Sequence, residues 1–133
     1  MKIRLIMALL AAVTTAGIPS IQLNAQGMKV GQLSDLHAWI NKMPPGPPSI
    51  HATGKITAPT PCYDALAEFA GLNKSNPPIY RVKVTLRQRP GVCIEVLSDV
   101  PFSYAQPNYV DNAEQMTIFS EQDSKTITIE IVH

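Results

Sequence analysis

The chain has 133 residues, of which 45% are hydrophobic and 16% are charged, and its formal net charge is +1. This length fits one domain with one hydrophobic core and argues against two domains. The nearly neutral balance argues against general nucleic-acid binding, because that activity needs a strongly basic surface.

The first 25 residues have the layout of a secretory signal peptide. Lys2 and Arg4 precede an apolar run at residues 5–18, and polar side chains follow at Gln22 and Asn24. The run is about fourteen residues long, shorter than the eighteen or more of a membrane-spanning helix. We therefore predict a soluble product, exported to the periplasm or the extracellular space. Cleavage is expected after Ala25, with cleavage after residues 15–17 and a retained amphipathic anchor as the alternatives.

Removal of this segment leaves 133 minus 25, or 108, residues, and it takes two basic side chains away, so that nine basic residues face ten acidic ones. Cys62 and Cys93 are the two cysteines of the sequence. Because exported proteins fold in oxidising surroundings, we predict a Cys62–Cys93 disulfide that stabilises the fold by roughly 3 to 4 kcal/mol. Two separate buried thiols are the alternative. Neither cysteine lies in a Cys-x-x-Cys motif or beside a histidine, which argues against a catalytic thiol.

Residues 26–48 are predicted to form an N-terminal arm. Leu33, Leu36 and Ile40 recur at helical spacing, and Ser34 is placed to cap a first turn. This spacing predicts a short helix at residues 33–42 or a loosely docked arm. Residues 43–49 contain four prolines, which favour an extended polyproline conformation, and we expect a stiff connector there. A proline-rich ligand for a partner is the alternative.

Residues 49–58 alternate without a break between apolar and polar side chains, which predicts a strand with one buried face. The apolar face comprises Ile50, Ala52, Gly54, Ile56 and Ala58. Residues 62–70 alternate less regularly; we predict a second strand, with a short helix as the alternative. Residues 73–78 are rich in turn formers and are expected to form a loop.

Residues 79–100 are predicted to form a β-hairpin. A three-residue loop at residues 89–91 puts Gly91 where a left-handed residue is wanted. It pairs Leu86 with Ile94 on an apolar face and Arg81 with Asp99 on a polar one. In this register Cys93 lies opposite Arg87 on the polar face. The disulfide is then expected to clip a neighbouring segment to the surface of a sheet.

A second hairpin is predicted around a turn at residues 121–124. It pairs Met116 with Ile129 and Ile118 with Ile127 on its apolar face. Residues 101–112, between the hairpins, are expected to be irregular. Tyr104 and Tyr109 are the candidate packing anchors of this segment.

Short one-sided strands separated by proline turns predict an all-β fold, a small antiparallel two-sheet β-sandwich at residues 49–133. The architecture is immunoglobulin-like, but the family pattern is absent. Trp39 precedes both cysteines, and no tyrosine stands two residues before Cys93. We therefore predict the architecture without assigning a family.

The sequence shows no recognisable catalytic or metal-binding pattern. His37, His51 and His133 do not stand at ligand spacing with each other or with a cysteine or carboxylate, so no metal site is predicted. Nucleophile elbows, phosphate-binding glycine loops and dinucleotide fingerprints are also absent. We expect neither an enzyme nor a cofactor, and a hydrolase with an unfamiliar site is the alternative.

A basic row is the clearest candidate binding surface in the sequence. Arg81, Lys83, Arg87 and Arg89 stand mostly at every second position, so a strand projects them to one side. They are candidates for binding an anionic polymer, a lipid headgroup or an acidic protein surface. An ordinary solvated face, with Asp99 and Glu95 as cross-strand partners, is the alternative.

These observations lead to a small exported, non-enzymatic binding or interaction protein whose scaffold presents loops or an edge strand to a protein partner. A protease-inhibitor-like module is a concrete version, because a rigid loop loses little entropy when it docks. The alternative is a structural or self-associating component of a cell-surface or periplasmic assembly. It would use residues 49–58 or 125–132 for strand addition.

Overall fold

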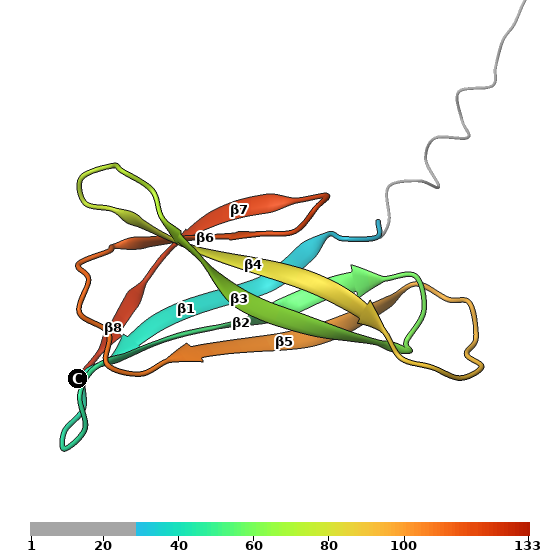
Figure 1. The fold of residues 1–133 in the computed structure, drawn as a ribbon, viewed down its shortest axis with the longest axis horizontal. Helices are drawn as coiled ribbons and strands as arrows, with labels where there is room; N and C mark the ends of the chain where they lie inside the picture. The colour runs from blue at the N-terminus through green and yellow to red at the C-terminus, as the bar shows by residue number, and fades with distance from the viewer. Residues whose placement is uncertain (1–28) are drawn as a thin grey trace, which may run out of the picture.

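A computed structural model describes residues 29–133 of the chain (Figure 1). The predicted signal segment and its cleavage sites lie outside these residues. The described part is built of strands, without a helix. The strands are β1 (Leu33–Asn41), β2 (Ser49–Ala58), β3 (Tyr63–Leu72), β4 (Ile79–Gln88), β5 (Ser98–Gln106), β6 (Gln115–Phe119), β7 (Ser124–Thr128) and β8 (Glu130–Val132).

The strands form two four-stranded sheets, in the orders β5-β2-β1-β8 and β3-β4-β6-β7. The all-β prediction is confirmed. The prediction that the strands are all antiparallel is wrong, because β1 pairs with β8 and β4 pairs with β6 in parallel. Both sheets are therefore mixed. The chain makes three local antiparallel pairings, β1–β2, β3–β4 and β6–β7, and it passes from one sheet to the other after β2, β4, β5 and β7.

One hydrophobic core takes side chains from both sheets. Strand β2 shows how the sequence builds it, because the residues predicted to be apolar-facing are buried along the whole strand. Thr57 departs from the alternation: it is only 3% exposed, and its hydroxyl donates to the Asp99 carboxylate of β5 at 3.0 Å. A buried hydroxyl is tolerated there because it has a hydrogen-bond partner.

Residues 33–41 form the strand β1, so the predicted short helix is wrong. A bulge explains the helical spacing. The pairing with β2 shifts between Ser34 and His37, and Asp35 has a positive φ of 52°. Because of the extra residue, the next inward-facing side chain after Leu33 is that of Leu36 and not that of residue 35. This spacing of three residues resembles the spacing on one face of a helix. Strand β1 lies between β2 and β8, so it belongs to the sheet and not to a docked arm.

The predicted hairpin at residues 79–100 is also wrong. Strand β4 pairs with β3, matching Val84 with Ala67 and Leu86 with Ala65. Strand β5 pairs with β2 in the other sheet. On the inner face of this sheet, the small alanines of β3 pair with the larger side chains of β4. The predicted hairpin instead paired β4 with the segment that follows it.

Strand β5 occupies part of the segment that was predicted to be irregular. Val100, Phe102 and Tyr104 point into the core at alternate positions. Pro101 lacks an N–H group, but it is compatible with β5 because this strand lies at the edge of its sheet. The irregular segment is therefore shorter than expected and begins after Gln106.

The second hairpin is confirmed, with its register moved by two residues. Met116 pairs with Ile127 and Ile118 with Lys125, so each residue keeps its predicted face while its partner changes. A shift of two preserves the alternation of faces. Ile129 is buried beyond the end of β7, and its N–H donates to the Glu114 carbonyl before β8 crosses to the first sheet.

Tyr80, Tyr104 and Tyr109 form an aromatic cluster at one end of the core. The hydroxyls of Tyr80 and Tyr104 are 2.7 Å apart, and the Tyr109 hydroxyl accepts the Ala113 N–H at 2.9 Å. All three side chains are buried, so the predicted anchoring by Tyr104 and Tyr109 is confirmed. Burial, followed by the hydrogen bond with Tyr104, raises the pKa of Tyr80 far above its ordinary value.

The close packing over Gly54 predicts a loss of stability for Gly54→Ala. A Cβ atom there would lie 2.6 Å from Leu36 Cδ2 and 2.7 Å from Phe102 Cζ, on the inner side of the sheet. We expect the free energy of unfolding to fall by about 1 to 3 kcal/mol, measured by urea denaturation. Gly46→Ala is the matched control, because its new methyl group would meet nothing within 4 Å. Equal effects of the two substitutions would contradict this account.

The raised pKa of Tyr80 predicts a loss of stability in alkali. A folded-state pKa above the unfolded value of 10.0 means that the stabilisation is complete below pH 10 and declines as the pH rises further. Above pH 10 the unfolding temperature of wild type should therefore fall more steeply with pH than that of Tyr80→Phe, because the variant lacks the ionisable hydroxyl. Parallel curves for the two proteins would show that Tyr80 does not control this decline.

Candidate functional site

The segment between β4 and β5, residues 89–97, is the candidate site, and we call it the 89–97 loop. It carries the chain from one sheet to the other and projects at one end of the molecule (Figure 1). The chain bends at Pro90 and at Gly91. Gly91 has a φ of 120°, a backbone conformation that glycine adopts without steric strain. The chain then runs without a turn from Val92 to Leu97. The strand that was predicted for residues 92–97 is therefore absent, and the segment has no strand partner.

The 89–97 loop presents aliphatic side chains to solvent. Val92 is 103% exposed, Ile94 69%, Val96 50% and Leu97 41%. Isolated exposed aliphatic residues are common, whereas four within six positions are a concentration of the kind found at contact sites. The predicted hairpin placed Ile94 on its apolar face, so its exposure differs from the prediction.

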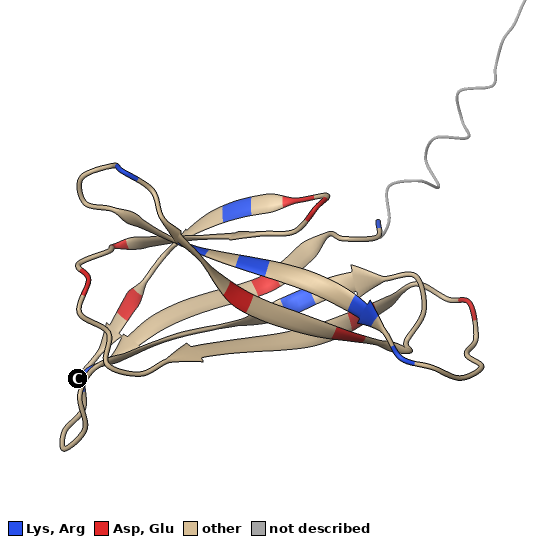
Figure 2. Cartoon of the chain, in the orientation of Figure 1, with Lys and Arg blue, Asp and Glu red and all other residues tan. Residues whose placement is uncertain are grey.

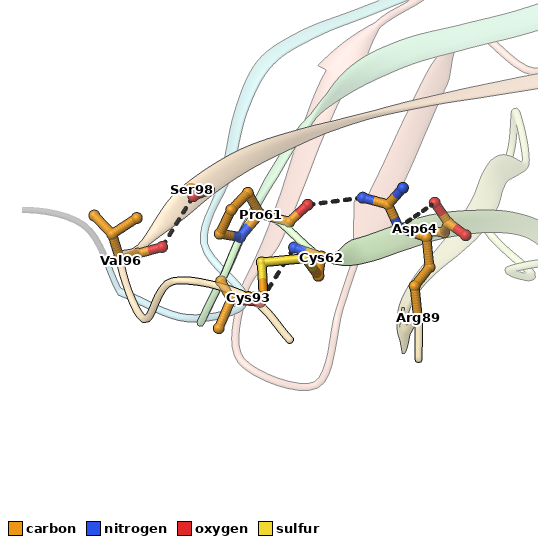
Figure 3. Close-up of a disulfide and its surroundings, with 8 residues drawn as sticks. Pro61, Cys62, Asp64, Arg89, Cys93, Val96 and Ser98 are labelled. Atoms are coloured by element: carbon orange, nitrogen blue, oxygen red, sulfur yellow. Dashed lines mark hydrogen bonds and ion pairs between the residues drawn. A yellow bond between two sulfur atoms is a disulfide. The ribbon is translucent and has the colours of Figure 1, made fainter. Parts of the chain in front are cut away.

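A disulfide fixes the middle of the 89–97 loop. Cys93 is bonded to Cys62, which immediately precedes β3, with 6.1 Å between their Cα atoms. The predicted disulfide is confirmed, although Cys93 does not lie opposite Arg87, whose partner in β3 is Asp64. Figure 3 shows that the bond joins the loop to the edge of the second sheet.

Hydrogen bonds fix both ends of the loop (Figure 3). Arg89 donates its backbone N–H to the Cys62 carbonyl at 2.9 Å and its guanidinium Nη2 to the Pro61 carbonyl at 2.9 Å. The same guanidinium lies 3.5 Å from the Asp64 carboxylate. At the other end the Ser98 hydroxyl donates to the Val96 carbonyl at 2.9 Å. The loop is therefore tied at its start, middle and end.

A shallow groove of about 520 Å³ lies beside the start and end of the loop. Its walls come from β3 and β5, which are edge strands of different sheets. Tyr63, Leu66 and Val100 supply apolar surface, and Asp64 and Asp99 supply carboxylates. The loop and the groove thus make one continuous candidate surface at this end of the molecule.

Arg81, Lys83 and Arg87 of the basic row occur along β4 (Figure 2), at positions that alternate with the buried Tyr80, Val82 and Val84. Arg89 follows the end of the strand. The row's predicted partners Asp99 and Glu95 are replaced by acids of β3, because Lys83 pairs with Glu68 and Arg87 with Asp64. Lys83 and Arg87 are both exposed. Their charges stand beside carboxylates, which weakens the attraction of this face for an anion.

The two remaining members of the row have contacts of their own. Arg81 lies 4.8 Å from the centre of the Phe119 ring and donates to the Ala70 carbonyl at 3.1 Å. Arg89 is paired with Asp64 at the loop. The structure thus keeps Arg81, Lys83 and Arg87 on one face but gives Arg89 a separate role at the tether. Anion binding by the row stays a prediction.

A second cluster, on the outer face of the first sheet, was missed in the sequence. Trp39 stacks between His37 and His51, with ring centres 4.9 and 5.1 Å apart. Nε2 of His37 lies 3.3 Å from Glu130 of β8. The spacing of two between His37 and Trp39 would have placed both on one face of a strand, had a helix not been predicted there. Because histidine covers both faces of the indole, a ligand could not stack on Trp39 without displacing one of them.

Within residues 29–133, no three histidine, cysteine or acidic side chains come together as a metal site would require. The same residues contain no helix that is long and apolar enough to cross a membrane. Strand β2, one of the two segments considered for strand addition, is paired on both sides and offers no free edge, so that prediction is wrong for residues 49–58. Strands β7 and β8 lie at sheet edges.

No protein-family model, curated protein or solved structure matches the chain. The function is therefore argued from the exposed surface and its chemistry.

The tether predicts that removing the disulfide destabilises the protein. Cys62 and Cys93 are 31 residues apart, and closing a loop of that length stabilises a fold by roughly 3 to 4 kcal/mol on the chain-entropy model. The double variant Cys62→Ala/Cys93→Ala should unfold at correspondingly lower denaturant concentration. Limited proteolysis should cut it first within residues 89–97. Unchanged stability, or first cleavage elsewhere, would contradict the tethering role.

Proposed function

We propose that the protein is a small exported, non-enzymatic binding protein whose immunoglobulin-like β-sandwich presents the 89–97 loop to a protein partner. The observation that carries the proposal is the exposure of four aliphatic side chains on a segment whose middle is fixed by a disulfide. An apolar surface of this kind gains free energy when a partner removes it from water.

The tether supports binding because it reduces the entropy that docking removes. A free nine-residue loop would lose conformational freedom in a complex, at a cost of order 1 kcal/mol for each residue that becomes fixed. The Cys93 bond and the hydrogen bonds of Arg89 and Val96 already restrict the 89–97 loop in the isolated protein. Preorganisation of this kind raises affinity without adding contacts.

The disulfide also supports export as part of the proposal. Such bonds persist in oxidising compartments and are rare where glutathione keeps thiols reduced. A signal peptide at residues 1–25 would deliver the chain to such a compartment. Within this scheme the sandwich is the scaffold, and the loop at its end makes the contact.

Photo-crosslinking in the native host tests the proposal. A photoreactive amino acid at position 94 should give discrete crosslinked products with another protein. The same amino acid at position 110 is the matched control, because Val110 is an aliphatic residue, 89% exposed, in a different loop. Ile94→Ser combined with Val96→Ser should abolish co-purification of the crosslinked protein and leave the unfolding temperature unchanged. The same products from both positions would contradict a specific loop, and products containing only this chain would favour a self-associating component.

A further inference from the structure

The shape of the 89–97 loop determines what kind of surface can cover it. The loop projects at one end of the molecule (Figure 1) and carries the exposed side chains of Val92 and Ile94, so it presents a convex surface. Two convex loops that meet in a dimer would bury little area, below the roughly 1,000 Å² that a specific interface needs. A partner with an elongated cleft would surround the same side chains on several sides. The loop therefore fits a cleft better than it fits a second copy.

The backbone of the loop is largely unpaired, as that of a free peptide ligand is. Among residues 29–133, the N–H groups of residues 91–97 make no backbone–backbone hydrogen bond, and these residues belong to no strand. These donors, and the carbonyls other than that of Val96, which accepts from the Ser98 hydroxyl, are thus available to a partner that binds by strand-type hydrogen bonds. Clefts of endopeptidases bind substrates in this way, with a pocket for one side chain.

Ile94 is the side chain best placed to enter such a pocket. It directly follows Cys93, so its backbone is held next to the tether while its side chain is 69% exposed. Val92 is more exposed but adjoins the bend at Gly91, and Val96 is less exposed and has its carbonyl engaged by Ser98. Ile94 therefore combines a fixed backbone with an accessible side chain.

We propose that the 89–97 loop occupies the active-site cleft of an endopeptidase whose primary pocket accepts small or β-branched aliphatic side chains, with Ile94 in that pocket. This inference rests on the proposed binding function, because it uses the same loop. The protein then acts as an inhibitor that is bound as a substrate would be. Specificity follows from the pocket, since a small apolar pocket accepts Ile94, whereas a pocket with a carboxylate at its base selects a basic side chain.

The surroundings of Ile94 would keep the loop in place even if the enzyme cut it. Hydrolysis of the bond between Ile94 and Glu95 consumes one water and leaves a carboxylate on Ile94 and an amine on Glu95. The first new end is one residue from the Cys93 tether, and the second is three residues before β5 begins at Ser98. Because both ends stay attached to the folded sheets, they would leave the cleft slowly.

Inhibition assays with three serine endopeptidases test the inference. Hydrolysis of short chromogenic peptides by an elastase-type, a chymotrypsin-type and a trypsin-type enzyme is measured with the purified protein. Wild type should inhibit the elastase-type enzyme most strongly. Ile94→Arg should weaken that inhibition by roughly 30-fold, as expected for a residue that dominates an interface, and should create inhibition of the trypsin-type enzyme. Val110→Arg, the control in the other exposed loop, should change neither.

The outcomes separate this inference from the general binding function. Absence of inhibition by wild type together with absence of trypsin-type inhibition by Ile94→Arg would overturn the endopeptidase inference. Crosslinking of position 94 to another protein would then still support the binding function. Absence of both inhibition and crosslinking would overturn the two proposals together. Rapid, complete degradation of the loop by the elastase-type enzyme would show a substrate and would also overturn the inhibitor role.

Discussion

The Cys62–Cys93 bond fixes the segment that passes from one sheet to the other, and the exposed end of the molecule depends on this constraint. Cys62 stands at the start of β3, an edge strand of the second sheet, and Cys93 lies between β4 and β5. Without the bond, the apolar residues near Ile94 would be free to collapse onto the neighbouring groove. With it, the middle of the loop is held at the edge of the sheet while the side chains of Val92 and Ile94 stay exposed to solvent.

The packed core holds in place the two sheets to which the 89–97 loop is attached. The aromatic cluster around Tyr80 closes one end of the core, and the hydroxyl groups of this cluster and of Thr57 find partners without water. Gly54 lets Leu36 and Phe102 approach the backbone of β2 from both neighbouring strands. These contacts hold the two sheets in one arrangement, so the 89–97 loop is attached to a closely packed base.

The strands that could be predicted are those whose alternation is unbroken. Residues 49–58 and 116–119 alternate cleanly, and their faces are correct in the structure. Strand β1 was mistaken for a helix because the bulge at Asp35 shifts its inward positions by one residue, and a single shift turns a period of two into an apparent helical step. At the candidate site the disulfide was predictable from composition and compartment, but the exposure of Val92 and Ile94 was not. Their alternation is equally consistent with a core strand.

The sequence by itself determined the strands whose alternation is unbroken and their apolar faces, because these properties depend on neighbours along the chain, and it made a Cys62–Cys93 bond the expected pairing. Only the tertiary structure decided which strands pair. Strand β4 satisfies its alternation with either β3 or β5, and the choice rests on how Ala65 and Ala67 fit against Leu86 and Val84 across the sheet. That choice sends β5 to the other sheet and leaves residues 92–97 without a partner strand. The exposed loop is thus a consequence of strand pairing, which acts between residues far apart in the chain.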